Sequence, residues 1–175
     1  MTRRLTPAMI GLLAVLIALT AVFTLLIRIP TPARGYVNLS DVAITFAALT
    51  FGPWVGLIVG GLGTAIADLL AGYAPYAPIS FVAHGLQGLL IGLIGYGQRS
   101  IPRMALAWLA GALAMILGYL LGGALYVGLP TALAEVPLNA FQTLVGAVVG
   151  IPLVFAVRKA YPAVDRLGQR PTWTE

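Results

Sequence analysis

The chain has no cysteine, one histidine and one lysine among its 175 residues. Without cysteine there are no disulfides and no thiolate metal ligands. A single histidine excludes histidine-rich zinc and haem sites within one chain. The one lysine, Lys159, does not lie in a Gly-x-x-x-x-Gly-Lys-Ser/Thr loop, which excludes ATP binding of the P-loop kind. Because Gly-x-Ser-x-Gly is also missing, we expect no enzyme, no metal and no cofactor.

Charged residues are scarce too, at 9% of the chain, whereas 60% of the residues are hydrophobic and the mean hydropathy is +0.98. Soluble domains carry roughly 25% charged residues, so this composition indicates an integral membrane protein. We expect a single transmembrane domain over residues 1–175. The net charge of +5 does not indicate nucleic-acid binding, because the arginines lie in short loops and at the ends rather than in one patch with interleaved aromatics.

Six apolar segments are present, with no alternating pattern and with runs longer than ten residues, which favours helices over a β-barrel. They cover about 5–27, 39–51, 53–71, 79–96, 104–127 and 137–157. Gly52-Pro53 divides the second from the third, because proline removes a backbone donor and disfavours helix in the residue before it. The predicted fold class is an all-α membrane protein, a compact bundle of six transmembrane helices.

The second segment is shorter than the roughly 20 residues that cross a bilayer, so it is either a short span or part of one long helix with the third. The basic residues distinguish these alternatives. With six spans, one side of the membrane receives eight of them: Arg3, Arg4, Arg99, Arg103, Arg158, Lys159, Arg166 and Arg170. The other side receives Arg28 and Arg34, so the positive-inside rule predicts six spans with both termini in the cytoplasm. The first segment exceeds the usual 7–15 residues of a signal peptide and is expected to be retained.

Polar residues from four of these segments lie near the ends assigned to the outside. They are Asn38, Asp41, Asp68, His84, Gln87, Asn139 and Gln142. An ionisable group in hydrocarbon costs roughly 2.5 kcal/mol or more unless it has a partner, so such residues indicate a function by default. Tyr73, Tyr76 and Tyr119 belong to the same outer region and supply flat apolar faces with a polar tip. Together these residues predict a binding pocket for an aromatic or heterocyclic ligand.

Each of these residues also has a structural interpretation. Asn38 can cap the second helix, and Asp41 in a first turn suits the helix dipole. Asp68 can be an internal partner of His84, and tyrosines at this depth are often interfacial anchors. The convergence of all of them at one depth favours the pocket.

Small residues form faces on several segments. Ala14 and Ala18 are four residues apart on the first segment, and the third and fifth segments carry glycines at similar spacing. Small residues allow two helix backbones to approach closely in lipid, either inside the bundle or against another protein.

Several motifs resemble those of the S components of energy-coupling factor (ECF) transporters. The motifs are Arg28-Ile-Pro-Thr-Pro, Gly35-Tyr-Val-Asn-Leu-Ser-Asp41, Phe51-Gly-Pro, Ala67-Asp68-Leu-Leu-Ala-Gly72-Tyr73 and Tyr76-Ala-Pro. The resemblance covers about residues 5–97 well and the last two helices in general character. It is strongest to S components for vitamin precursors such as hydroxymethylpyrimidine or pyridoxine.

The resemblance implies a subunit of an ABC importer that binds a water-soluble vitamin at the outer face of a prokaryotic plasma membrane. Its partners would be a membrane T component, on which Ala14 and Ala18 would dock, and two cytoplasmic ATPases. Residues 28–38 would form an extracellular lid over the pocket, and the ligand would be delivered inward by toppling of the whole subunit.

His84 is a departure from that resemblance, because related sequences often carry lysine there. Histidine is mostly neutral near pH 7 and can both donate and accept a hydrogen bond, which favours a neutral, flat ligand. Pyridoxine and hydroxymethylpyrimidine fit, while thiamine and a deazapurine precursor stay open. Two other functions also stay open: a membrane scaffold without a small-molecule site, and an ion-coupled carrier with Asp68 and His84 as relay groups.

Overall fold

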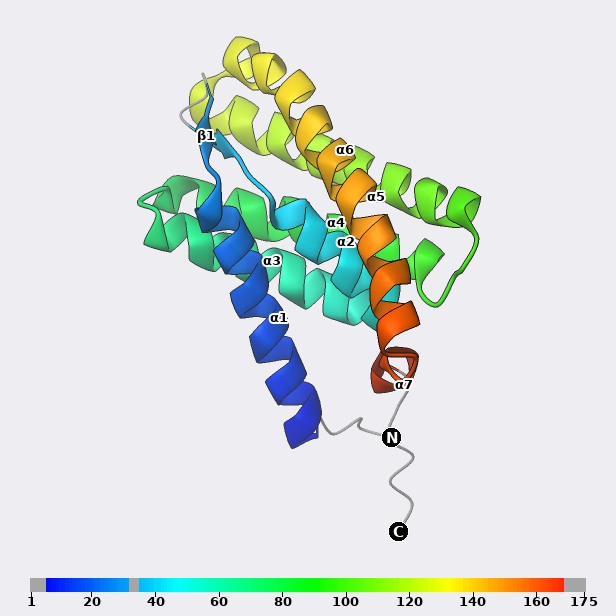
Figure 1. Cartoon of the computed structure of the whole chain (residues 1–175). Helices are drawn as coiled ribbons and strands as arrows, with labels where there is room; N and C mark the ends of the chain where they lie inside the picture. The colour runs from blue at the N-terminus through cyan, green and yellow to red at the C-terminus, as the bar shows by residue number, and fades with distance from the viewer. Residues whose placement is uncertain (1–5, 32–34, 169–175) are drawn as a thin grey trace, which may run out of the picture.

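A computed structural model of the chain describes residues 6–31 and 35–168, apart from the side chain of Arg166. The described chain is almost entirely helical (Figure 1). Its main helices are α1 (Pro7–Leu26), α2 (Ser40–Phe51), α3 (Pro53–Leu70), α4 (Ala77–Gly95), α5 (Ile101–Val127) and α6 (Leu129–Ala160). The smaller elements are strands β1 (Ile29–Pro30) and β2 (Tyr36–Val37), the 3-10 helix η1 (Ala74–Tyr76) and helix α7 (Val164–Gly168). The predicted all-α class is confirmed.

Some sequence-based predictions fall on residues outside this description. They concern Leu5 of the first segment, Arg3, Arg4, Arg34 and Arg170 of the charge pattern, and residues 32–34 of the lid segment. The described flanks of that segment form a short antiparallel ladder, in which Ile29 lies opposite Val37 and Pro30 opposite Tyr36.

Local sequence explains where the helices begin and end. Thr6 caps α1, because its hydroxyl accepts a hydrogen bond from the Met9 amide at 3.2 Å. The sharp turn between α2 and α3 needs Gly52, whose φ is +98°, and Pro53 then occupies the first turn of α3. Gly128, with φ +87°, makes the corresponding turn between α5 and α6.

Helix α6 differs from the expected segment, because it begins at Leu129 rather than near Pro137. Pro137 and Pro152 both lie inside the helix. Each proline removes one backbone donor, but a membrane helix tolerates this where neighbouring groups satisfy the freed carbonyl. The region that we expected to connect the last two segments is therefore the first two turns of α6.

Helix α2 is the centre of the bundle. Eleven of its twelve residues are buried, and α1, α3, α4 and α6 all pack against it. Among the described residues, five helices are long and apolar enough to cross a membrane, whereas α2 at twelve residues is shorter than the usual span. The requirement for about 20 apolar residues applies to helices that face lipid. A helix that is covered on all sides has its apolar surroundings provided by the neighbouring helices.

Glycine allows α3 and α4 to pack with their backbones in contact. A Cβ atom added at Gly56 would overlap the backbone of Gly88, and one added at Gly88 would overlap that of Gly56. Gly60 meets the carbonyl of His84 in the same way, one turn further along. The glycines of the third segment thus serve tight packing inside the bundle.

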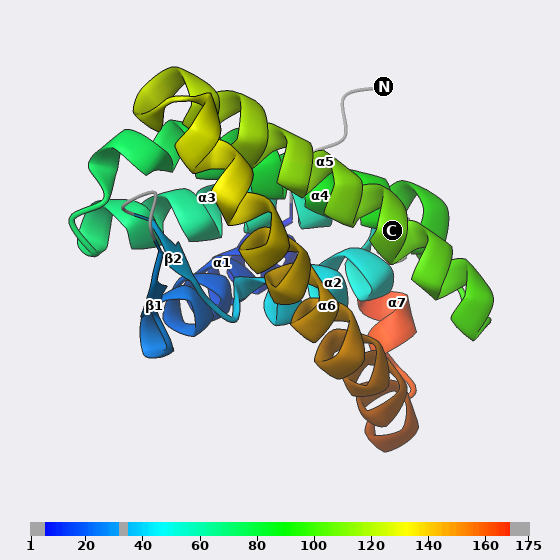
Figure 2. The same ribbon diagram turned by 90° about the horizontal axis from the view of Figure 1, so that it is seen from above.

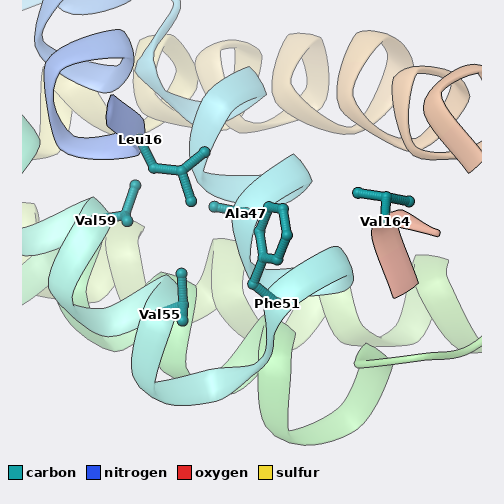
Figure 3. Packing of buried hydrophobic residues seen from close by; sticks show 6 residues of the cluster. All are labelled: Leu16, Ala47, Phe51, Val55, Val59 and Val164. Carbon is teal, nitrogen blue, oxygen red and sulfur yellow. The ribbon is translucent and has the colours of Figure 1, made fainter. Parts of the chain in front are cut away.

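A hydrophobic cluster joins α1, α2, α3 and α7 (Figure 3). Its buried members are Leu16, Ala47, Phe51, Val55, Val59 and Val164. Close to it, the buried guanidinium of Arg158 donates to the carbonyls of Gln98 and Leu49 at 2.7 and 3.2 Å and to Asp165 at 2.8 Å. These contacts hold the end of α6, the α4–α5 turn and α7 together.

The connections gather at two opposite ends of the bundle. Figure 1 shows the β ladder, the α3–α4 connection and the α5–α6 turn at one end. The beginning of α1, the α2–α3 and α4–α5 turns and the end of α6 lie at the other. Figure 2, seen from above, shows α6 crossing in front of α2 beside the β ladder.

Candidate functional site

A cavity lies at the end of the bundle that carries the β ladder. The space between its lining residues, with the open mouth included, is about 520 Å³. The lining comes from the β2 region, α3, η1, α4, α5 and α6. It comprises Gly35, Tyr36, Asn38, Asp68, Tyr76, Ser80, Tyr119, Gly123, Ala132, Glu135, Asn139 and Gln142.

Asp68 is the buried carboxylate of this cavity, at the end of α3. Its Oδ1 accepts a hydrogen bond of 2.6 Å from the Tyr36 hydroxyl, which comes from β2. Its Oδ2 is buried and accepts no hydrogen bond of 3.5 Å or less among the described residues, although the Ser80 hydroxyl lies close enough to stabilise the carboxylate. An unpaired buried carboxylate oxygen is costly, so this atom is available to a ligand that brings a donor.

Tyr36 keeps its proton under all ordinary conditions. Burial, and then the hydrogen bond that it donates to Asp68, raise the pKa of Tyr36 far above its usual value. Its ring meets that of Tyr73 edge to face, with ring centroids 4.7 Å apart. The strand that carries Tyr36 is therefore fastened to α3 at the rim of the cavity.

Two further tyrosines shape the cavity walls. The hydroxyl of Tyr119 in α5 lies 2.6 Å from the Ser80 hydroxyl in α4. Tyr76 lines the cavity and packs edge to face against Tyr126 at 5.3 Å. These rings provide flat apolar surface, and the hydroxyls of Tyr119 and Ser80 provide groups that donate and accept hydrogen bonds.

Behind the cavity, a buried polar network joins α2, α4 and α6. Asp41 Oδ2 accepts from Gln87 Nε2 at 2.7 Å, and Asp41 Oδ1 accepts from Gln142 Nε2 at 3.0 Å. His84 Nδ1 lies 2.7 Å from Gln87 Oε1 and 3.5 Å from Asp41 Oδ1. Both neighbours of this nitrogen are acceptors, so Nδ1 carries the proton.

Gln142 connects this network to the cavity. Its Nε2 donates to Asp41, and its Oε1 accepts from the backbone N–H of Asn38 at 2.8 Å. Gln142 is also part of the cavity lining. Both ends of the side-chain amide are thus fixed by the protein, so Gln142 presents one defined orientation to the cavity.

Of the ten residues predicted for the pocket, six line the cavity in the structure and four do not. Six line the cavity: Asn38, Asp68, Tyr76, Tyr119, Asn139 and Gln142. Asp41, His84 and Gln87 form the network behind it, and Tyr73 supports Tyr36 from outside the lining.

Two of the structural interpretations are resolved by the contacts. Among the described residues no hydrogen bond or ion pair joins Asp68 directly to His84, although their charges interact: Asp68 accepts from Tyr36, while His84 contacts Gln87 and Asp41. Asn38 does have a structural role, since its Oδ1 accepts from the Ser40 amide at 2.8 Å at the start of α2. It lines the cavity as well, so the two roles coexist.

Sequence reasoning missed Tyr36, Ser80 and Glu135 as lining residues. Ser80 precedes His84 by four residues, so helical spacing would have placed it on the same face. Tyr36 comes from the segment treated as a lid, and Glu135 from a region expected to be a loop but helical in the structure.

Ala14 and Ala18 lie elsewhere, on the exposed face of α1. The side of α1 that faces the bundle is formed instead by residues such as Leu16 and Thr20. Within residues 6–31 and 35–168, no group of three or more His, Cys, Asp or Glu side chains is arranged to hold a metal ion.

Comparison with known proteins identifies the family. Residues 4–159 match the model of the family described as ECF-type riboflavin transporter, S component. The chain is 36% identical over 159 residues to the thiamine precursor transporter HmpT of Lactococcus lactis. The matched region covers 90% of this chain and 87% of HmpT. It is also 35% identical over 139 residues to an uncharacterized protein of Pyrococcus woesei, covering 79% of this chain and 93% of that protein. Together with five membrane-length apolar helices, these matches show that this multi-pass membrane protein is not an enzyme but belongs to the family of S components of ECF-type transporters.

Proposed function

We propose that this S component captures a single-ring nitrogen heterocycle, of the hydroxymethylpyrimidine or pyridoxine type, in the cavity beside Asp68. The observation that carries the proposal is the buried Oδ2 of Asp68, which accepts no hydrogen bond of 3.5 Å or less among the described residues and belongs to a lining that also contains tyrosines and amides. The exocyclic amino group or a protonated ring nitrogen of such a ligand would donate to this oxygen.

The size of the site favours a single ring. The family model is named for riboflavin and HmpT for a thiamine precursor, so the two comparisons point to ligands of very different size. The cavity of about 520 Å³ includes its open mouth, which leaves a smaller enclosed volume for the ligand itself. We therefore expect the site to accommodate a pyrimidine more readily than a tricyclic flavin with its ribityl chain.

Isothermal titration of the detergent-purified protein with hydroxymethylpyrimidine, pyridoxine, thiamine and riboflavin tests this proposal. We expect a single-ring compound to bind most tightly, with a Kd below about 1 μM. Tightest binding of riboflavin would overturn the ring-size argument. Failure of all four compounds to bind at that level would overturn the site itself.

We further propose that all six helices cross a prokaryotic plasma membrane, with both termini in the cytoplasm. Among the described basic residues, Arg99, Arg103, Arg158 and Lys159 belong to the α4–α5 turn, the start of α5 and the end of α6, at one end of the bundle. Arg28 lies beside the β ladder at the other end. The positive-inside rule then supports a cytoplasmic α4–α5 turn and an external cavity, with the short helix α2 shielded from lipid by its neighbours.

Because the chain contains no cysteine, single-cysteine labelling can test this topology without background. Ala74→Cys and Ser100→Cys place a thiol at exposed positions of the α3–α4 connection and the α4–α5 turn. In intact cells, a membrane-impermeant maleimide is expected to label the first variant at least about tenfold more than the second, because it does not cross the hydrocarbon core. Both should be labelled equally after permeabilisation. Labelling of Ser100→Cys in intact cells would contradict the proposed orientation.

We also propose that the exposed Ala14 and Ala18 face of α1 docks on the T component, which joins two ATPases to form the complete importer. Small side chains permit the close backbone approach on which helix association in lipid depends. The absence of a P-loop in this chain fits a division of labour in which ATP is hydrolysed by other subunits.

Ala14→Leu/Ala18→Leu is expected to weaken co-purification of the T component and ATPases by at least about tenfold, or about 1.4 kcal/mol. Titration with the vitamin should be unchanged, because neither alanine lines the cavity. Val15→Leu, at another exposed position of α1, serves as the matched control. An intact complex with the double variant would exclude this face as the docking surface.

The contacts give no support to an autonomous ion-coupled carrier. Such a carrier was suggested by Asp68 and His84 as relay groups, but Asp68 is bonded by Tyr36 while His84 is bonded by Gln87. Ligand uptake by vesicles that contain this chain without a T component or ATPases would favour the carrier over the S component.

A further inference from the structure

Helices α5 and α6 are joined by the Gly128 turn and diverge toward their other ends (Figures 1 and 2). An open groove of about 960 Å³ lies between them near the beginning of α5 and the end of α6. Every residue that lines it is apolar, among them Ile101, Trp108, Ile151, Pro152 and Phe155. Ala105 and Ala147, whose side chains are small, also line the groove.

Trp108 bridges the two helices within this groove. Its indole N–H donates to the Thr143 carbonyl in α6 at 2.8 Å, so its one polar atom is already satisfied. Pro152 carries no backbone N–H of its own. The groove therefore offers hydrocarbon contacts and no unsatisfied donor from these two residues.

Lys159 follows this groove in the last turn of α6. Val148, Pro152 and Phe155 line the groove at helical spacing, and Lys159 comes four residues after Phe155 on the same helix face. Its side chain is exposed. Arg158 is directed inward instead, where its guanidinium is bonded to Gln98, Leu49 and Asp165. Lys159 is thus a cation at the end of an apolar groove.

We propose that this groove binds an acyl chain of an anionic phospholipid whose headgroup phosphate pairs with Lys159. The chain would lie along Phe155, Ile151 and Trp108, and the headgroup would lie beyond the last turn of α6. A cation next to an apolar groove matches the two parts of such a lipid. A juxtamembrane lysine attracts anionic headgroups over zwitterionic ones.

The position of the groove distinguishes it from the surface proposed for the T component. Helix α1 packs on α2 and α3, whereas α5 packs on α4 and α6. Figures 1 and 2 both show α1 on the other side of α6 from the opening between α5 and α6. A T component docked on α1 would leave the groove facing lipid.

Tryptophan quenching by brominated lipids tests the proposal. The variant Trp54→Phe/Trp173→Phe retains Trp108 in the groove as the single fluorophore. The matched control, Trp108→Phe/Trp173→Phe, retains Trp54, which is 67% exposed at the beginning of α3 and does not line the groove. Each protein is reconstituted in bilayers that contain brominated phosphatidylglycerol or, at the same mole fraction, brominated phosphatidylcholine.

We expect Trp108 to be quenched about twofold or more strongly by the anionic lipid than by the zwitterionic one, while Trp54 shows no preference. Lys159→Gln in the Trp108 protein should abolish the preference and leave titration with the vitamin unchanged. Equal quenching of Trp108 by the two lipids, or a preference that survives Lys159→Gln, would overturn the proposal. Protection of Trp108 from both lipids would also overturn it and would assign the groove to a second protein helix.

Discussion

Asp68→Ala is expected to lower the affinity for the vitamin ligand by about 30- to 100-fold, equivalent to about 2–3 kcal/mol for a hydrogen bond to a charged group. The substitution removes the one lining carboxylate oxygen found buried without a partner among the described residues. We expect the variant to stay folded, because it also removes an incompletely satisfied buried charge. The Tyr36 hydroxyl loses its acceptor but lies at the rim, where water can replace it.

Isothermal titration, with circular dichroism to verify the helical content, measures this effect. Tyr36→Phe is the matched control, because it removes the hydrogen bond to Asp68 Oδ1 and leaves the carboxylate in place. We expect Tyr36→Phe to cost less than about tenfold, and Asp68→Asn to lie between the two. Wild-type affinity in Asp68→Ala would show that the ligand does not bind at this carboxylate.

Asp41→Ala is expected to have the largest effect on stability, with a loss of about 3–5 kcal/mol. Asp41 is 1% exposed and accepts hydrogen bonds from the amides of Gln87 and Gln142, with His84 next to it. Its removal leaves the side-chain amide donors of Gln87 and Gln142 without this acceptor in the interior of the bundle, while His84 Nδ1 keeps Gln87 Oε1. Ligand binding should weaken as well, because Gln142 loses the contact that orients it toward the cavity.

The midpoint of thermal unfolding in detergent measures the first effect. A double variant, Asp41→Ala/Gln87→Leu, provides the internal comparison, since it removes one of the stranded amides together with its acceptor. We expect the double variant to be more stable than the sum of the two single variants predicts, by about 1 kcal/mol or more. An unchanged midpoint for Asp41→Ala would show that the network contributes little to the fold.

The helical architecture was predictable because the length of an apolar run, and the glycine and proline residues that interrupt it, directly indicate local structure. Gly52-Pro53 indicated the break between α2 and α3, and the structure ends one helix and begins the next there. The same reasoning was wrong at Pro137. Proline often occupies the first turn of a helix, so we expected the last helix to begin there, but α6 begins at Leu129. In lipid the rest of the helix remains favourable, so one missing donor does not end it.

The polar residues indicated a shared region of the bundle but not which of them contact one another. In the structure Asp41, His84 and Gln87 contact one another, and Asp68 lines the cavity. Spacing along single helices does not determine partners between helices. The pairing of Asp41 with Gln142 depends on the close approach of α2 and α6, which Gly146 permits by lying against Asp41.

The amino-acid sequence alone was sufficient to identify a helical membrane protein, the positions of most of its helices and its family. Those properties depend on composition, on apolar run length and on short motifs, all of which are local. The tertiary structure decided which carboxylate faces the cavity and which is held behind it, because burial and hydrogen bonding depend on distances between helices. It also decided that the twelve-residue helix α2 sits at the centre of the bundle, since its surroundings are provided by four other segments.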